Sequence, residues 1–291
     1  MKRFLRLLAL ACALTLLAAP GFASGLEPIP YAMEPAPYPP HKECYLPDNA
    51  GYHDDSLDIR IETFRHLDTT VMAAYVTLTD SSQMRTGTAA PTAPLSKRLN
   101  TVAKMSKYYQ AVMGINGDYF CYHSQGVVVR NGQALRLNYN EGRDTLIIDE
   151  KGDFTILHPT TQEAYEALEG EVIHAFCFGP GLVIDGEALT DLNTVSVDNG
   201  KYKQTQRMAI CQLGPLSYLI LTCEGPENEN SVGMDLAQWA ALCKEMGAIN
   251  AYNLDGGSSS TIALNNRKIN ALSSNKERPV GDMIYFCTLI P

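Results

Sequence analysis

Short apolar segments that end at Gly, Asn or Asp recur along most of the chain and predict a strand-rich protein. Many of them are rich in β-branched residues, and several are joined by tight turns. The clearest turn is Asn131-Gly132, a dipeptide that favours a two-residue hairpin. The strands that we expect are residues 71–79, 111–115, 127–130, 145–149, 154–157, 172–178, 182–184, 208–213, 218–223, 249–254 and 283–289.

Helical spacing of apolar residues is found in few segments. Residues 95–109 have this spacing with Ser96 as the expected N-cap, and residues 234–246 have the strongest pattern, which ends at Gly247. Residues 161–168 predict a shorter helix. Because strands outnumber helices and no internal repeat is visible, we expect an α+β fold: a single strand-rich mixed-sheet domain with a few packed helices.

The N-terminus has the pattern of an export signal. Three basic residues precede an apolar stretch from Leu7 to Ala19, and small residues surround Ala23. We therefore expect residues 1–23 to be a signal peptide and the protein to be secreted or held at the outer face of the cell envelope. The apolar stretch is shorter than a membrane span of about 20 residues, and an uncleaved anchor is the alternative.

Proline is concentrated directly after this signal. Eight of the sixteen prolines fall within the first 47 residues. Segments of this kind are extended and pack little. We expect residues 24–55 to be a proline-rich linker and residues 56–291 to form the globular domain.

Composition narrows the class of function. The chain has 23 basic and 32 acidic residues, and loss of the signal peptide changes the formal charge from −9 to −12. A nucleic-acid-binding groove requires a basic stripe, which this sequence lacks, so we exclude that class. Seven cysteines lie beyond the signal peptide, several of them within apolar runs. We favour buried thiols over a disulfide framework because an odd number cannot pair within one chain.

The segment with the clearest chemical character follows the expected strand 249–254. It places Asp255 at the end of the strand, directly before Gly256, Gly257 and Ser258. Glycine allows the backbone to approach a ligand closely, and successive N–H groups and hydroxyls can face an anion or a sugar. A Gly/Ser turn capped by the aspartate is the competing interpretation.

A second segment at a strand end has the same design. Asn116, Gly117 and Asp118 follow the expected strand 111–115 and precede aromatic residues that either stack on a sugar or anchor the loop. Arg207 is a cation at the start of another expected strand, and an arginine in such a place is most often a surface residue.

Other chemistries have weaker support. Asp118 and Asp255 together could hold a divalent cation through carboxylate oxygens. No Asp-x-Asp-x-Asp loop is present, so we expect no metal and no cofactor. His123 and His174 are candidate acids or bases, which we interpret as structural histidines.

Five motifs occur along the chain in a fixed order. They are Ile115-Asn-Gly-Asp-Tyr-Phe120, Gly179-Pro-Gly-Leu-Val-Ile-Asp-Gly186, Arg207-Met-Ala-Ile210, Asn253-Leu-Asp-Gly-Gly-Ser258 and Glu277-Arg-Pro-Val280. Together they resemble the phosphodiester glycosidase domain family, which includes the lysosomal uncovering enzyme, N-acetylglucosamine-1-phosphodiester α-N-acetylglucosaminidase, and many exported bacterial proteins. The resemblance spans roughly residues 95–290. The chain departs from the family pattern at Ser258, where a third glycine is frequent, and at Met208, where threonine is frequent.

This resemblance implies hydrolysis of a sugar 1-phosphodiester between C1 and oxygen, in cell-envelope or exopolysaccharide glycans. On this basis we assign Asp255 as the leading base or nucleophile, Asp118 as a second carboxylate and Arg207 as the phosphate contact. Arg278 is a second candidate phosphate contact. The residues expected to shape the pocket are Asn116, Gly117, Gly256, Gly257 and Ser258. We expect no stable protein partner.

Two alternatives remain open from the sequence. One is a non-catalytic glycan-binding or exopolysaccharide-assembly module that uses the same cleft. The other is an exported hydrolase of an acyl or phosphate ester, with Ser258 or Ser259 as the nucleophile.

Overall fold

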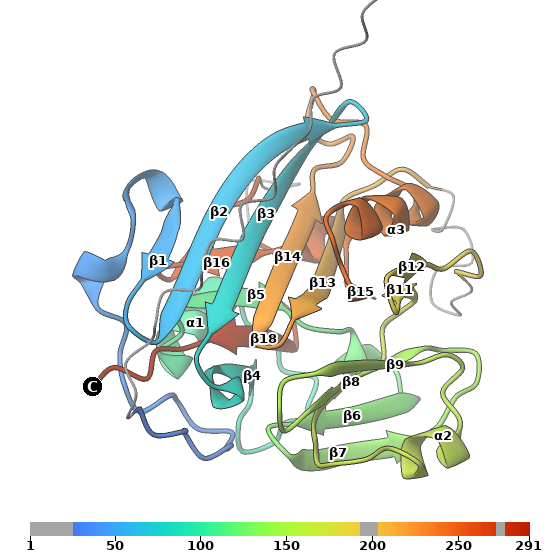
Figure 1. Cartoon of the computed structure of the whole chain (residues 1–291), viewed down its shortest axis with the longest axis horizontal. Coiled ribbons are helices and arrows are strands. Elements are labelled where there is room, and N and C mark those ends of the chain that lie inside the picture. The colour runs from blue at the N-terminus through green and yellow to red at the C-terminus, as the bar shows by residue number, and fades with distance from the viewer. Residues whose placement is uncertain (1–25, 193–202, 272–276) are drawn as a thin grey trace, which may run out of the picture.

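The computed structural model describes residues 26–192, 203–271 and 277–291. The predicted signal peptide lies outside these ranges. Within them the chain forms eighteen strands and three α-helices, which confirms the predicted α+β class (Figure 1). The helices are α1 (Val102–Tyr109), α2 (Gln162–Glu166) and α3 (Leu236–Glu245). None of the described helices is long and apolar enough to cross a lipid bilayer.

The strands form three sheets, and every ladder between described strands is antiparallel. The large sheet has the order β1 (Gly51–His53), β2 (Leu57–His66), β3 (Thr69–Leu78), β14 (Ser217–Cys223), β13 (Arg207–Gly214), β15 (Asn250–Leu254), β11 (Gly181–Ile184) and β12 (Glu187–Ala188). The β6–β10 sheet has the order β7 (Gln133–Asn138), β6 (Gly126–Arg130), β10 (Val172–Phe176), β8 (Thr145–Asp149) and β9 (Phe154–Leu157). The β5–β18 sheet has the order β17 (Arg267–Lys268), β16 (Ile262–Leu264), β5 (Met113–Asn116), β18 (Asp282–Phe286) and β4 (Met84–Thr88).

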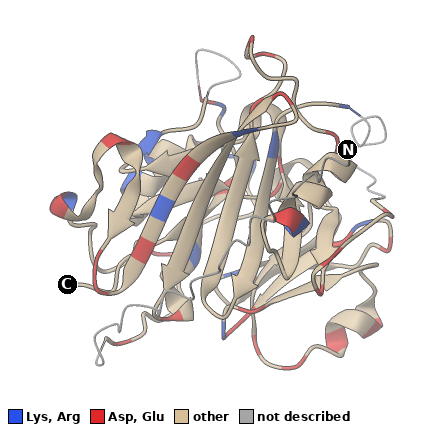
Figure 2. Ribbon diagram, turned by 45° about the horizontal axis from the view of Figure 1, so that its top comes forward, with Lys and Arg blue, Asp and Glu red and all other residues tan. Residues whose placement is uncertain are grey.

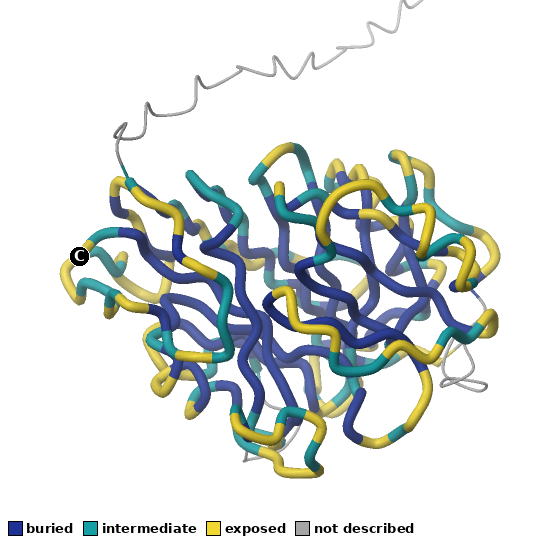
Figure 3. Tube along the Cα trace, turned by 90° about the horizontal axis from the view of Figure 1, so that it is seen from below, coloured by how far each residue is buried: buried dark blue, intermediate teal, exposed yellow. Residues whose placement is uncertain are grey.

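The main core lies between the three sheets, all of which contribute side chains to it. Side chains alternate along β3, so Ala74 and Val76 point into this core while Val71 and Ala73 point to the opposite face of the large sheet. That opposite face is covered by α3, whose Trp239 is fully buried against it. Burial of a large apolar side chain stabilises a fold by about 1.5–3 kcal/mol. Figure 3 shows the buried strands at the centre and the exposed loops around them.

The first helix begins later than the sequence pattern predicts. It starts at Val102, where the side chain of Thr101 accepts the N–H of Lys104 at 3.3 Å as the N-cap. The predicted start near residue 95 is wrong because Leu95 and Leu99 are exposed and have no core surface to pack against. A helical turn without such packing gains too little to offset its conformational entropy.

The proline-rich segment packs against the domain, so its described part, residues 26–55, is not the loosely packed linker that we expected. Its backbone contacts include Ile29 N–H to the Ser82 hydroxyl at 2.9 Å and Ala36 N–H to the carbonyl of Tyr109 at 3.1 Å. Prolines already restrict the unfolded chain, so fixing this segment costs less entropy. Carbonyl groups of this segment accept hydrogen bonds from side chains of the domain. Nη2 of Arg85, for example, donates to the carbonyls of Pro30 and Ala32.

Strand β2 is long and was not predicted. Leu57 and Ile59 point into the core, and the charged residues Asp58, Arg60 and Glu62 alternate with the apolar residues of the strand. Figure 2 shows acidic and basic positions along this edge of the large sheet. Alternating charged residues obscure the apolar signal of such a strand, although the period of two is present.

All seven cysteines of the described residues are free thiols, and six of them are buried. This confirms the interpretation of buried apolar cysteines.

Candidate functional site

The three sheets meet at one place, and each contributes a charged residue there. Asp255 follows β15 of the large sheet, and Asp118 follows β5. Arg130 ends β6, and Asp282 begins β18 next to β5. A pocket at this junction, which we call the carboxylate pocket, is lined by Asp118, Tyr119, Cys121, Tyr122, Asp255, Ser259, Arg278, Pro279, Val280 and Gly281.

Asn116 joins the two motif loops that carry the carboxylates. It is fully buried, and its Nδ2 donates to the backbone oxygen of Asp255 at 2.8 Å. Its Oδ1 accepts the N–H of Thr261 at 3.0 Å. One amide therefore fixes the Asp255 loop to the end of β5, two residues before Asp118.

Two glycines in these loops occupy positions where a side chain would collide. A Cβ at Gly117 would lie 2.5 Å from Cγ of Asp282. A Cβ at Gly256 would lie 2.8 Å from the carbonyl oxygen of Gln206, which accepts the N–H of Gly257 at 3.0 Å. The glycines thus allow each loop to pack closely against a neighbouring segment, at Asp282 and at Gln206. Their expected role of close approach to a ligand stays a prediction.

A fully buried guanidinium lies between two of the carboxylates. Nη2 of Arg130 is 3.0 Å from Oδ1 of Asp118 and 2.7 Å from Oδ2 of Asp282. Nε of Arg130 also donates to Oδ2 of Asp282 at 2.9 Å. The rings of Phe120 and Phe176 enclose the guanidinium, at 5.4 and 4.2 Å from its carbon. Buried charges require such compensation, so Arg130 holds both carboxylates in place.

The carboxylate of Asp118 makes two further hydrogen bonds. Its Oδ1 accepts the N–H of Phe120 at 3.0 Å, which opens a short 3-10 turn, and its Oδ2 accepts the N–H of Cys177 at 2.9 Å. Both oxygens are therefore engaged by the protein. Asp118 lines the pocket as an anchored negative charge.

Asp282 differs from Asp118 in having one unengaged oxygen. Its Oδ1 is buried and has no hydrogen-bond partner among the described residues. Burial raises the pKa of Asp282, Arg130 lowers it, and the nearby Asp118 and Asp255 raise it further. Three carboxylates therefore lie close enough to affect one another around one buried arginine.

Asp255 is partly exposed and lies next to a serine and an arginine. Ser259 donates a hydrogen bond to its carboxylate. Nη1 of Arg278 donates to Oγ of Ser259 at 3.1 Å and lies 3.4 Å from Oγ of Ser258. Burial raises the pKa of Asp255 to about 6, although Ser259 and Arg278 lower it. A carboxylate with this pKa can exchange a proton near neutral pH.

The structure places Arg207 away from this pocket. Its Nε donates to the carbonyl of Met234 at 2.9 Å and its Nη2 to the carbonyl of Lys203 at 2.8 Å. Met208, the next residue, belongs to the core between the sheets, so alternation along β13 directs Arg207 to the other face, which carries α3. The cation that the structure brings to Asp255 is Arg278, the second candidate from the sequence.

The carboxylate pocket is a narrow slot beside a wider groove. Its free space is about 10 Å³, roughly that of one water molecule, whereas the groove encloses about 470 Å³. Cys121 and Tyr122 line both. Tyr122 is 47% exposed, and its ring stacks on that of Tyr119 with 4.2 Å between the centroids. The groove is lined by Leu95, Lys97, Phe120, Cys121, Tyr122, His123, Ser124 and Arg136.

His174 is a structural histidine, as predicted. Its Nδ1 accepts the N–H of Asn131 at 3.2 Å, and its Nε2 is 3.1 Å from the carbonyl of Met84, to which it donates. Burial lowers the pKa of His174 to about 3, so the ring is neutral. His123 lies instead at the edge of the groove, with Nδ1 2.8 Å from the carbonyl of Gln125.

Sequence reasoning missed Arg130 and Asp282. Arg130 precedes the Asn131-Gly132 turn, where arginine is usually exposed, and Asp282 precedes an apolar strand without any glycine-rich signal. The sequence does contain one signal for such residues, a charged residue directly next to a wholly apolar strand. A charge that is buried there needs a partner of opposite charge.

The described residues contain no group of three His, Cys, Asp or Glu side chains placed to hold a metal ion. The positive charge next to Asp118 and Asp255 comes from Arg130 and Arg278. Independence from metal and cofactor stays a prediction, which an assay with and without chelator tests.

The raised pKa of Asp255 predicts the pH profile of any reaction that uses its ionised form. Activity should rise with pH through about 6, because Asp255 loses its proton there rather than near 4. We expect kcat/KM to show a single acid limb with an apparent pKa of about 6. The Arg278→Gln variant should move this limb to higher pH, since the arginine lowers the pKa of Asp255. A profile that is flat down to about pH 4.5 would exclude Asp255 as the titrating group.

Comparisons with known proteins identify the family and the fold of this chain. The sequence matches the family model described as phosphodiester glycosidase over residues 109–287, more than half of the chain. The SPbeta prophage-derived uncharacterized protein YomE of Bacillus subtilis is 28% identical over an alignment of 191 residues, which covers 63% of this chain but 29% of that protein. The catalytic domain of zebrafish N-acetylglucosamine-1-phosphodiester alpha-N-acetylglucosaminidase, auto-inhibited by its pro-peptide, is 17% identical, with a TM-score of 0.65 over 82% of this chain and 86% of that one. A protein of Burkholderia pseudomallei described as exported is 14% identical, with a TM-score of 0.52 over 76% of this chain and 74% of that one. The chain belongs to the phosphodiester glycosidase family.

Proposed function

We propose that this protein hydrolyses sugar-1-phosphodiester linkages between C1 of the sugar and the bridging oxygen. The observation that carries the proposal is the pairing of Asp255 and Arg278 in one pocket, with Ser259 bonded to both. A carboxylate and a guanidinium are thereby presented side by side. The carboxylate would stabilise the positive charge that develops at C1 of the sugar. The guanidinium would stabilise the negative charge of the departing phosphate.

The chemistry of this bond matches these two groups. Its transition state resembles an oxocarbenium ion, which a nearby carboxylate stabilises. Asp255 would act as nucleophile or as the base that activates water. The leaving group is a phosphate ester anion, so a strong general acid is less needed than for an ordinary glycoside. A guanidinium forms bidentate hydrogen bonds to phosphate, and Arg278 would supply them.

The slot and the groove suggest how the substrate lies. The slot is too small for a sugar, so the sugar would rest in the groove against the exposed ring of Tyr122, with C1 directed to Asp255. The anchored carboxylate of Asp118 would add negative potential near the developing cation. Gly117, Gly256, Gly257 and Ser258 would shape this pocket through the backbone course of the two loops.

The biological setting follows from the N-terminal pattern. We propose that the chain is exported and acts on cell-envelope or exopolysaccharide glycans that carry sugar-phosphate links. The signal-like N-terminus and the description of the Burkholderia neighbour as an exported protein support this. YomE is more than three times as long as the matched segment, so the activity of that whole protein is a separate question.

A product assay tests the proposed function. The protein is incubated with a panel of sugar-1-phosphodiesters, with and without chelator, and free sugar and phosphomonoester are measured. We expect equal amounts of the two products and no effect of the chelator. Binding of the same compounds without turnover would instead support the alternative of a non-catalytic glycan-binding module.

Arg278→Gln should reduce kcat/KM for these substrates by about 10²-fold, because one donor to a departing anion contributes roughly this much. The matched control is Arg267→Gln, since Arg267 is exposed in the β16–β17 hairpin. We expect the control to keep wild-type activity. An Arg278→Gln enzyme as active as the control would show that the phosphate is held elsewhere.

A further inference from the structure

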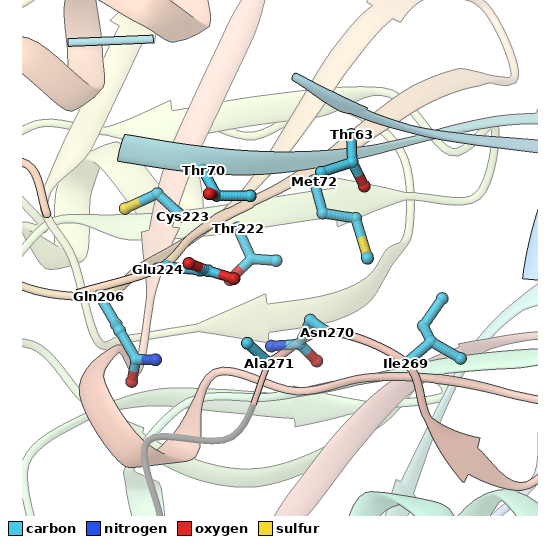
Figure 4. A pocket seen from close by; sticks show the side chains of 10 residues that line it. All are labelled: Thr63, Thr70, Met72, Gln206, Thr222, Cys223, Glu224, Ile269, Asn270 and Ala271. Carbon is cyan, nitrogen blue, oxygen red and sulfur yellow. The ribbon is translucent and has the colours of Figure 1, made fainter. Parts of the chain in front are cut away.

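A second pocket lies at the end of the large sheet and shares no lining residue with the carboxylate pocket (Figure 4). It encloses about 320 Å³ between β2, β3, β14 and the chain after β17, which is enough for one sugar unit. Its polar lining residues are Thr63, Thr70, Gln206, Thr222, Glu224 and Asn270. We call it the threonine pocket.

Gln206 gives this pocket an unmet hydrogen-bonding need. The residue is 3% exposed, and its Oε1 is buried without a hydrogen-bond partner among the described residues. A buried polar atom in this state is unfavourable and calls for a donor. Figure 4 shows the Gln206 side chain at one end of the pocket, with its amide nitrogen on the side of the other lining residues. Rotation of the amide by 180° would turn Oε1 into the pocket, where a hydroxyl group of a bound molecule would supply the donor.

The charge of the pocket selects against an anion. Glu224 presents its carboxylate there, with Oε2 accepting from the Ser231 hydroxyl at 2.7 Å, and no Lys or Arg is among the described lining residues. The hydroxyl of Thr222 already donates to the carbonyl of Arg207 at 2.9 Å, so its remaining capacity is to accept. The Glu224 carboxylate and the Thr222 hydroxyl are thus acceptors that the donors of a ligand can meet, while the hydroxyls of Thr63 and Thr70 can donate or accept.

The remaining lining residues are apolar. Met72 lies beside Thr63, its cross-strand neighbour, and Ile269 and Ala271 come from the chain after β17, so thioether and aliphatic groups are interspersed with the polar groups. A sugar ring has this dual character, with hydroxyl groups at its rim and C–H groups on its face. A nucleotide or phosphate is anionic, so the carboxylate of Glu224, with no Lys or Arg among the described lining residues, disfavours it.

Two residues that line the threonine pocket are hydrogen-bonded to the backbone of the Asp255 loop. The carbonyl of Gln206 accepts the N–H of Gly257 at 3.0 Å, and Nδ2 of Asn270 donates to the carbonyl of Ser260 at 3.0 Å. Asp255 of this loop therefore lines the carboxylate pocket, and the backbone of the same loop is hydrogen-bonded to Gln206 and Asn270 of the threonine pocket.

We propose that the threonine pocket binds a neutral sugar unit, separately from the phosphate-bearing sugar at Asp255. This goes beyond the proposed function, because the binding needs no hydrolysis. It assigns the protein to glycans that present an uncharged sugar in addition to a sugar-phosphate link.

A titration of the full chain tests the proposed sugar binding. The titrants are neutral methyl glycosides of glucose, galactose, mannose and N-acetylglucosamine, and binding is measured by NMR or calorimetry. At least one should bind, and Gln206→Met should weaken it at least about 10-fold by removing the amide at constant length. Thr63→Phe, at an exposed position of β2, should block the pocket similarly if the first variant does not fold. Arg278→Gln should leave the binding unchanged.

Two results would overturn the proposal. One is the absence of binding by every neutral glycoside up to about 50 mM to the folded protein. The other is binding that survives both Gln206→Met and Thr63→Phe but is lost in Tyr122→Ala, which would place the sugar in the groove. Failure of hydrolysis with intact glycoside binding would count against the proposed function alone.

Discussion

Asp255→Asn is expected to lower the release of free sugar from a sugar-1-phosphodiester by at least about 10³-fold. The amide keeps the shape of the side chain and its contact with Ser259, but it cannot attack C1, activate water or stabilise a cation. Turnover under single-turnover conditions measures the loss. The neutral amide also removes a partly buried charge, so thermal stability should be kept or increased.

The matched control for this variant is Asp185→Asn. Asp185 lies in the exposed β11–β12 turn at φ 51°, a backbone conformation that asparagine tolerates well. We expect this variant to retain wild-type turnover. An Asp255→Asn enzyme within a few-fold of this control would remove Asp255 from the mechanism.

Arg130→Met should lower the free energy of unfolding by about 3–5 kcal/mol, as is typical when one partner of a buried ion pair is removed. The substitution leaves Asp118 and Asp282 buried without their shared counter-charge. Urea denaturation at pH 7 measures the effect. Loss of less than about 1 kcal/mol would show that the two carboxylates do not depend on Arg130.

The pH dependence of this variant has a definite sign. Asp282 already has a raised pKa in the folded protein, and loss of Arg130 raises it further. The folded state then binds more protons than the unfolded state, so the stability of Arg130→Met should fall as pH rises from 5 to 8. Asp282→Asn in the same background should recover part of the loss and flatten this dependence.

The strands and the two motif loops could be predicted because their signals are local. β3, β13, β14 and β15 are apolar runs bounded by turn residues, and the structure confirms them. Asp118 and Asp255 each follow such a strand and line one pocket. Their catalytic roles stay predictions, since lining a pocket does not by itself establish chemistry.

The choice between the two arginines depends on information that no local pattern holds. Arg207 and Arg278 both belong to motifs that resemble those of the family, but the face to which Arg207 points follows from the register of β13 against β15. Arg278 reaches Asp255 through a loop contact with Ser259, which is nineteen residues away. Contacts of this kind arise only after the sheets have assembled.

The errors near the N-terminus have a similar cause. Proline content indicated an extended backbone for the N-terminal segment, but the structure has 3-10 turns at Lys42–Cys44 and Pro47–Asn49. The proline content also gave no information on the carbonyl acceptors that Arg85 would bind. The helix start at Val102 was likewise decided by the absence of packing for Leu95 and Leu99 rather than by their spacing.

The position of bond cleavage tests the central claim most directly. Hydrolysis of a sugar-1-phosphodiester in water labelled with ¹⁸O places the label in whichever product receives the water oxygen. If Asp255 directs water or its own carboxylate to C1, mass spectrometry should find the phosphomonoester unlabelled and the label in the freshly released sugar. Label in the phosphomonoester would mean attack at phosphorus, and it would contradict the account.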